Sequence, residues 1–392
     1  MQRIIIKNFG SISSAEIELK KIILLIGENA VGKSTIIKLI STFLWIEKSV
    51  FRGSDINWLE KENRFKNTFL SYHRIENYLK TDTLIEYYGE ASIIKYFQNK
   101  ITISKRDVHD YQLPQLMYVP AERNFLTYLR STKDLKSEGA LQDFEREYFN
   151  ATNNLKGSLS LPISSLEIEY NKRHEMLYVK NKNYKIKITE AASGLQSLIP
   201  LYIVTEYLAK LVENKDNIPM SSGDIRIFQD EISSIITNNN LSEKQKQIAI
   251  STLSNKFNKK AFVNIVEEPE QNLFPVTQMN LIKHLVSISN LNKDNKLIIS
   301  THSPYVLATI NNMILAKKAS GTSFKDVETK VNKQLWLDFE NVYAGFVKDG
   351  TVEKIIDKDF EMIPIEQIDS VSKLINEEFD YLYNILTEKD HV

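Results

Sequence analysis

The hydrophobic pattern of the first fifty residues predicts three short strands, a loop and a helix, in that order. Apolar runs rich in isoleucine and leucine cover residues 3–8, 15–19 and 22–26, and their lengths are typical of strands. The third run leads directly into a glycine-containing loop. Apolar residues then recur at helical spacing from residue 34 to residue 45, so we expect a helix there.

Three further apolar segments predict the rest of a central sheet. Residues 115–120, 261–266 and 296–300 are short enough for strands, and residues 276–289 between the last two have a helical pattern. Parallel strands joined by helices form α/β sheets. We therefore predict an α/β fold with a mixed and parallel β-sheet core.

The remaining segments are expected to complete a single domain over residues 1–392. A β meander is expected between residues 166 and 188 and a helix at 195–212, and charged faces predict a further helix at 123–150. The other expected parts are a peripheral α/β lobe with β-strands at residues 46–115, a short helical arm inserted at 214–260, and C-terminal elements at 305–392.

Composition narrows the class of protein. Fifty Lys and Arg residues balance fifty Asp and Glu residues, so the chain as a whole is not a polycation made for nucleic acid or an anionic membrane. The absence of cysteine excludes disulfides, thiolate zinc sites and a cysteine nucleophile. Charged residues interrupt the apolar runs near the N-terminus before they reach membrane length. We expect a soluble, cytoplasmic protein without a membrane partner.

A glycine-containing loop lies between the strand at 22–26 and the helix at 34–45. Its sequence, GENAVGKST, fits G-x-x-x-x-G-K-[ST], in which the backbone wraps a phosphate at a helix start. We expect Lys33 to span the β- and γ-phosphates and Ser34 to ligate Mg²⁺. A chance loop that caps a helix is the alternative. The expected nucleotide contacts in this loop are Gly27, Asn29, Ala30, Val31, Gly32, Lys33, Ser34 and Thr35.

Polar residues follow the other predicted strands at what would be the same sheet edge. Glu267 and Glu268 end the strand at 261–266, so the first can hold Mg²⁺ and the second can act as general base toward water. A solvated acidic turn is the alternative. His302 follows the strand at 296–300 and could contact the γ-phosphate and the attacking water, although a lone histidine is often a structural hydrogen bonder. Ser193 and Gly194 head a predicted helix, where they could bind an anion or merely cap the helix.

Taken in order, GENAVGKST, ASGLQ, VNIVEEPE and STHSP resemble the motifs of ABC-type ATPases. The closer resemblance is to the branch that holds the structural-maintenance-of-chromosomes proteins, the RecF-like repair ATPases and the OLD (overcoming lysogenization defect) ATPases. It implies an ATPase head that binds ATP and Mg²⁺ and closes as a head-to-tail homodimer or a higher ring. It implies that residues 27–35 are the Walker A motif, with Lys33 catalytic, and that Walker B ends in Glu267 and Glu268. It also implies a switch histidine at His302. The signature motif would be Ser193, Gly194 and Gln196, acting in trans.

Three features depart from that pattern or extend it. Glu267 stands where the usual Walker B residue is aspartate, and the signature lacks the second glycine of transporter ATPases, which argues against a transporter. The stretch Pro-Ala-Glu-Arg resembles one in OLD-like ATPases. It makes Glu122 and Arg123 candidates for nucleotide or metal contacts, with an ordinary ion pair at a helix start as the alternative.

The resemblance also indicates a function. No TOPRIM-like acidic cluster and no long heptad arm are visible, so we expect a slow ATPase without nuclease activity in this chain. It resembles the stand-alone, PARIS-like or Septu-like ATPases of anti-phage systems, which implies a sensor and scaffold that controls a separately encoded effector, a nuclease or toxin. The alternative is a DNA-repair or DNA-end-binding ATPase. Lysines such as Lys256, Lys259 and Lys260 could serve DNA, although a solvated surface also explains them.

Overall fold

The computed structural model describes residues 2–108, 111–129, 138–163, 165–213, 222–238, 241–357, 359–364 and 370–388. Within these residues one sheet has eleven strands, in the order β6-β5-β4-β1-β2-β15-β14-β3-β13-β12-β7. Its strands are β1 (Arg3–Phe9), β2 (Ile12–Glu18), β3 (Ile22–Gly27), β4 (Leu79–Tyr88), β5 (Ser92–Phe97), β6 (Lys100–Lys105), β7 (Pro114–Val119), β12 (Ala261–Glu267), β13 (Lys296–Thr301), β14 (Val342–Lys348) and β15 (Thr351–Lys354).

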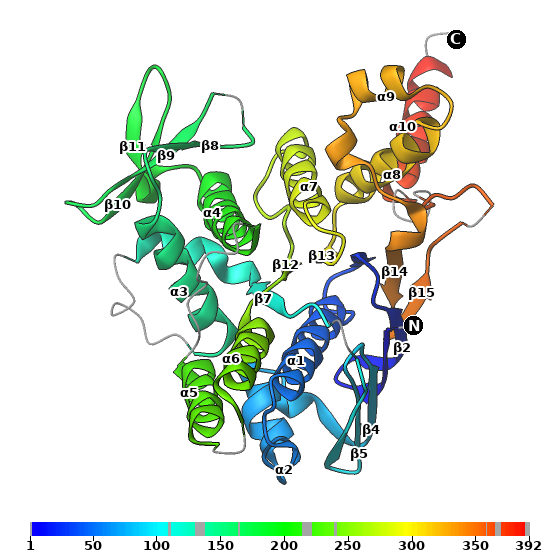
Figure 1. Cartoon of the computed structure of the whole chain (residues 1–392). Helices are drawn as coiled ribbons and strands as arrows, with labels where there is room; N and C mark the ends of the chain where they lie inside the picture. Colours follow the sequence, from blue (N-terminus) through cyan, green and yellow to red (C-terminus); the bar gives the residue numbers. More distant parts are fainter. Residues whose placement is uncertain are drawn as a thin grey trace.

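Helices flank this sheet, and a second sheet of four strands lies apart from it at the upper left of Figure 1. The α-helices are α1 (Lys33–Phe51), α2 (Ile56–Leu59), α3 (Ala140–Asn153), α4 (Ser193–Glu213), α5 (Ser222–Thr237), α6 (Glu243–Phe257), α7 (Pro275–Asn290), α8 (Pro304–Ala319), α9 (Phe324–Lys330) and α10 (Ser370–Glu388). The second sheet contains β8 (Ser158–Ser160), β9 (Glu167–Asn171), β10 (Met176–Lys180) and β11 (Lys185–Lys187).

Five neighbouring strands of the main sheet run parallel, namely β14, β3, β13, β12 and β7. The carboxyl ends of β3, β13 and β12 lie side by side, because Ile26 pairs with Thr301 and Glu267 pairs with Ser300. Parallel strands place their carboxyl ends together, and in open α/β sheets ligands bind there. The loops after Gly27, Glu267 and Thr301 are therefore neighbours in space.

Alternate residues of the central strand β3 contact two separate cores. Ile22, Leu24 and Ile26 pack with residues of α4, α7 and α8, whereas Ile23 and Leu25 pack with α1 and the antiparallel strands. A strand covered on both faces is apolar at every position, because successive side chains point to opposite sides. The helix α1 and the helix α4 therefore cover opposite faces of the sheet, as Figure 1 lets the reader follow.

The structure confirms the predicted α/β fold with its mixed sheet. The strand, loop and helix at the start of the chain are present, and α1 continues six residues beyond the predicted end at residue 45, to Phe51. The strands β4, β5 and β6 form antiparallel pairs that extend the main sheet from β1, so the β-strands of the peripheral lobe share its hydrogen bonding. The predicted arm contains α5 and α6, and residues 214–221 and 239–240 of it lie outside the described residues.

One predicted helix is wrong. Instead of a single helix at 123–150, a 3-10 helix covers Ala121–Tyr128 and α3 begins at Ala140, with residues 130–137 outside the described residues. Gly139 precedes α3 with φ at 65°, and a side chain there would overlap the backbone oxygen of Tyr72. Only glycine adopts this backbone freely, so Gly139 marks a helix start that charge patterning does not reveal.

The helix α4 is, among the described residues, the one helix long and apolar enough to cross a membrane. Within its most apolar stretch 72% is buried inside the protein. Leu198, Leu201 and Val204 belong to the core that it shares with α7 and α8. Its apolar character is that of a core helix covered on most sides.

Candidate functional site

The loop between β3 and α1 has the backbone of a phosphate cradle. Gly27 has φ at 155°, and a side chain there would overlap the backbone oxygen of Val347 on the neighbouring strand. Glu28, Asn29 and Ala30 are exposed, and α1 begins at Lys33 directly after the loop. The first N–H groups of a helix have no partner within the helix, so they can donate to an anion held over the loop.

Lys33 reaches back over this loop. Its ammonium donates to the backbone oxygens of Gly27 at 2.9 Å and Glu28 at 2.5 Å, and lies 3.3 Å from Nδ1 of His302. Burial lowers the pKa of the Lys33 ammonium to about 8, against the attraction of Glu268 and other nearby carboxylates. A cation taken out of water with neutral partners is poorly compensated, and a phosphate would supply the missing negative charge.

His302 connects Lys33 to Glu268. Its Nε2 lies 3.2 Å from Oε1 of Glu268, on the side of the ring opposite the lysine. Because an ammonium has only hydrogen-bond donors, Nδ1 must accept from Lys33, which leaves the ring hydrogen on Nε2 to be donated to Glu268. The structure therefore brings together three residues that the sequence placed in three separate motifs.

Glu268 has an unusual backbone. Its φ of 42° lies in the left-handed region, which costs a residue with a side chain roughly 1–2 kcal/mol. Its N–H donates to the oxygen of Ser300 at 2.9 Å, and its own oxygen accepts from Arg123 at 2.7 Å. Strain of this kind persists only where surrounding contacts hold it, and it is concentrated at functional sites.

Arg123 has a structural role that the sequence did not indicate. Its side chain is completely buried and donates to the backbone oxygens of Pro120, Glu267 and Glu268, and to that of Ser197 in α4. Burial lowers its pKa to about 10, and nearby glutamates partly offset this. It therefore joins the end of β12 to the start of α4. These bonds give Arg123 a structural role, and its contact with nucleotide or metal stays a prediction.

Glu270 connects the loops after β12 and β13. Its Oε1 accepts from the Thr301 hydroxyl at 2.8 Å and from the N–H of His302 at 2.6 Å. The sequence reasoning gave this residue no role, although it is the third carboxylate in Glu-Glu-Pro-Glu. These two hydrogen bonds fix the backbone of His302, whose ring faces Glu268.

Glu267 lies deeper than its neighbour Glu268. Its carboxylate accepts from the Tyr118 hydroxyl and from the N–H of Ala121, and Lys38 lies 3.6 Å away. Tyr118 comes from β7 and Lys38 from α1, and the sequence reasoning identified neither. Both are ordinary residues of a strand and a helix, so no local motif could have revealed them.

Ser34 and Glu267 offer the hard oxygen donors that Mg²⁺ prefers. Among the residues that the structure describes, none forms a hydrogen bond with the Ser34 hydroxyl, which is therefore available to a metal. The described residues contain no group of three or more histidines and carboxylates arranged to enclose a metal by themselves. Mg²⁺ keeps several waters and is bound by one or two protein groups together with substrate phosphates, a number of protein ligands that Ser34 and Glu267 could supply.

The predicted signature residues lie at the start of α4. Ser193 is exposed and Gly194 is half-buried, and a side chain on Gly194 would come within 2.6 Å of the backbone oxygen of Asn272. Gln196 is buried, and its amide bonds to the backbone oxygens of Ile188 and Thr189 and to the Tyr128 hydroxyl. Thus Ser193 faces solvent, whereas the amide of Gln196 is already engaged inside the chain.

The fold and this site define the class of protein. A phosphate loop between β3 and α1, beside two parallel strands that lead into Glu268 and His302, is the arrangement of a P-loop ATPase. The chain belongs to the family described as "AAA domain, putative AbiEii toxin, Type IV TA system", whose model matches residues 22–308.

A curated relative is the endonuclease GajA from Bacillus cereus (strain HuB5-5), which is 23% identical over 398 residues. The match covers 83% of this chain and 57% of GajA, so the chain spans little more than half the length of that relative. Similar solved structures include the SMC head domain from Thermotoga maritima, with 10% identity, a TM-score of 0.36, and coverage of 90% of this chain and 97% of that one. The recombination mediator protein RecF has 12% identity, a TM-score of 0.30, and coverage of 91% and 98%.

Proposed function

We propose that the chain binds and hydrolyses ATP slowly as a head-to-tail dimer and acts as a sensor and scaffold for a separately encoded effector in anti-phage defence. The observation that supports the catalytic part is the row formed by Lys33, His302 and Glu268 at the carboxyl edge of the parallel strands. These side chains come from three separate segments of the chain that only the folded sheet brings together. That GajA, the curated relative, is named an endonuclease leaves the absence of nuclease activity in this chain a prediction.

In the proposed mechanism the γ-phosphate of ATP takes the place of the neutral acceptors around Lys33. Glu268 accepts a proton from water as the water oxygen bonds to the γ-phosphorus, and the bond from that phosphorus to the bridging oxygen of ADP breaks. His302 donates to Glu268 before the reaction, and we expect it to contact the γ-phosphate. Arg123 and Ser300 hold the strained backbone that aims the Glu268 carboxylate.

Mg²⁺ would be held by Ser34 and Glu267, and when bound it neutralises charge on the β- and γ-phosphates. The chain's own contribution is to keep the Glu267 carboxylate in one place. Tyr118 and the Ala121 N–H hold both of its oxygens, and Lys38 balances its charge in this structure.

The proposal of a dimer is supported by the positions of the two helix starts. Lys33 begins α1 and Ser193 begins α4, and these helices cover opposite faces of one sheet. No hydrogen bond or ion pair among the described residues joins Ser193 or Gly194 to the phosphate loop. Exposed Ser193 is instead available to the nucleotide of a second copy, which would complete each site at the interface.

A mixing experiment tests whether Ser193 acts in trans. Lys33→Ala and Ser193→Glu should each be nearly inactive alone, because every site then lacks the lysine or carries a repelling charge beside the phosphates. After the two variants are mixed in equal amounts, half of the dimers should contain one intact site of two, so ATPase activity should return to about one quarter of the parental rate.

Each variant incubated with itself is the control for exchange and stability. Sites built within one chain would give no recovery on mixing, and that result would contradict the dimer. Because Ser193 is exposed, its substitution is not expected to disturb folding.

The effector is tested in the ATP-bound state. A tagged Glu268→Gln chain should retain a partner protein in stoichiometric amount when purified from its native host with ATP and Mg²⁺, whereas Lys33→Ala should not retain it. The reason is that the proposed scaffold surface exists only in the closed dimer. Mass spectrometry and nucleic-acid analysis of the eluate give the readout. Elution of DNA without any protein partner would contradict the scaffold and support the DNA-binding alternative.

A further inference from the structure

The buried carboxylate of Glu267 has a positively charged neighbour in Lys38. The Lys38 ammonium lies 3.6 Å from Oε1 of Glu267, and Glu267 is only 5% exposed. The Tyr118 hydroxyl donates to the same oxygen. Among the residues that the structure describes, Lys38 is the one cation within ion-pair distance of this carboxylate. It therefore supplies the charge that balances a carboxylate held away from water.

Lys38 approaches Glu267 from the side of the proposed metal site. It comes four residues after Ser34 in α1, and residues at this spacing lie on one face of a helix. Ser34 and Glu267 are the two residues that would hold Mg²⁺. An ammonium beside the same carboxylate is close to the place of a dication, and like charges in a partly buried place repel each other strongly.

A small pocket beside Lys38 offers its ammonium another position. The pocket has a volume of about 40 Å³, which is room for one group of about the size of a water molecule. Its lining includes Lys38 and Glu267 together with His73, Glu122 and Glu138. Glu122 and Glu138 are exposed, so their carboxylates can attract a cation that leaves Glu267.

His73 is the unpartnered group of this pocket. Its side chain is 3% exposed, and neither ring nitrogen has a hydrogen-bond partner within the described part of the chain. Burial lowers the pKa of His73 to about 3, and the nearby charge of Lys38 adds to this effect. The ring is therefore neutral and has one nitrogen that can accept from an ammonium. Its edge lies against Tyr118, which itself bonds to Glu267.

We propose that Lys38 is a counter-ion of Glu267 that Mg²⁺ displaces, and that the displaced ammonium moves into the pocket beside His73. This inference rests on the proposed function, because the metal is expected to arrive with ATP. Lys38 then weakens metal binding, since Mg²⁺ must separate an existing ion pair and leave a cation nearby. The residue therefore sets how strongly the nucleotide site depends on phosphates to hold its metal.

Equilibrium titration with a fluorescent ATP analogue tests this inference, once in excess Mg²⁺ and once in EDTA. The Glu268→Gln background prevents turnover during the titration. Lys38→Met keeps the length of the side chain and removes its charge. In Mg²⁺ this variant should bind the analogue about tenfold more tightly than the background protein, because the metal no longer competes with an ammonium. In EDTA its affinity should not rise.

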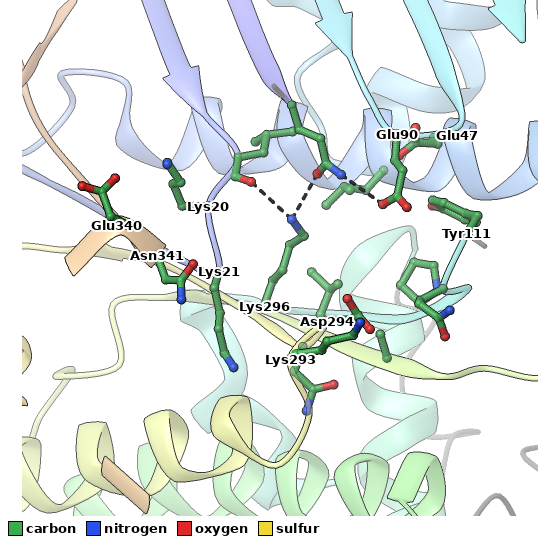
Figure 2. A pocket seen from close by; sticks show the side chains of 18 residues that line it. Lys20, Lys21, Glu47, Glu90, Tyr111, Lys293, Asp294, Lys296, Glu340 and Asn341 are labelled. Atoms are coloured by element: carbon green, nitrogen blue, oxygen red, sulfur yellow. Dashed lines mark hydrogen bonds between the residues drawn. The ribbon is translucent and has the colours of Figure 1, made fainter. Parts of the chain in front are cut away.

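Lys21→Met is the matched control and should leave both affinities unchanged. Lys21 also has a partly buried ammonium, which donates to the backbone oxygen of Asn292 at 3.1 Å. Figure 2 shows it in a cavity at the start of β3, whose other end leads into the phosphate loop. Six strand residues separate the two ends, a distance of about 20 Å.

The outcomes distinguish this inference from the proposed function. Equal affinity of Lys38→Met and Lys21→Met in Mg²⁺ would overturn the role of Lys38 and leave ATP binding intact. Weaker binding by Lys38→Met in both solutions would also overturn it, because Lys38 would then bind the triphosphate itself. Absence of binding by the background protein in both solutions would contradict the proposed nucleotide site, and the inference with it.

A double-mutant cycle tests where the displaced ammonium goes. His73→Phe removes the neutral acceptor and keeps a ring against Tyr118. It should weaken binding in Mg²⁺ about threefold to tenfold when Lys38 is present, and have no effect when Lys38 is replaced by methionine. An equal loss in both backgrounds would exclude His73 as the acceptor. Glu122→Gln, at an exposed position, makes the same comparison without altering the core, and unfolding curves of every variant reveal any loss of the fold.

Discussion

ATP turnover should fall about a hundredfold to ten-thousandfold when Glu268 is replaced by glutamine. Glutamine keeps the size of the side chain and one oxygen acceptor, but it cannot take a proton from the attacking water. The hydrogen bond from His302 Nε2 can be kept, because the amide oxygen still accepts. The measurement is steady-state release of phosphate at saturating ATP and Mg²⁺.

The same variant should retain ATP and accumulate as a dimer. Lys33, Ser34 and the backbone of the phosphate loop are unchanged, so the contacts that bind nucleotide remain while the step that ends the bound state is slowed. Light scattering after size-exclusion chromatography with ATP should show the dimer. Glu353→Gln, an exposed residue of β15, is the control. Hydrolysis at the parental rate by Glu268→Gln would exclude Glu268 as the base.

The catalytic part of this site could be predicted because Glu268 and His302 directly follow strands, and Lys33 ends the phosphate loop that follows a third strand. In a parallel sheet the residues after successive strands meet at one edge, so Lys33, Glu268 and His302 could be assigned to one place from their order alone. The hydrophobic pattern also located β1, β3, β7, β12 and β13 within one or two residues, whereas β2 begins three residues earlier than predicted. These predictions rest on local sequence and on one rule about parallel sheets.

The residues that hold the site in place could not be predicted in this way. Arg123 reaches carbonyl groups 144 and 145 positions further along the chain, and Tyr118 reaches Glu267 across 149. The bonds of Arg123 go to backbone oxygens, which impose no residue type on the partner, and the Tyr118 bond joins two residues too far apart in sequence for a local motif to reveal.

Lys33→Ala should abolish measurable ATP binding, which makes it the sharpest test of the phosphate loop. Lys33 is a cation with only neutral close partners, and burial already lowers its pKa to about 8. The triphosphate would restore full charge compensation, so removal of the lysine loses charge-assisted bonds to two phosphates and weakens binding about a hundredfold or more. Titration with a fluorescent ATP analogue measures the loss.

Lys7→Ala, on the exposed side of β1, is the matched control and should bind ATP as the parent does. The unfolding midpoint of Lys33→Ala without nucleotide should stay close to that of the parent, because the truncation removes a poorly compensated charge and leaves the backbone oxygens of Gly27 and Glu28 open to water. Unchanged ATP affinity in Lys33→Ala would show that the nucleotide binds elsewhere. Loss of ATP binding together with loss of the ATP-dependent dimer would instead tie the closed state to this single ammonium group.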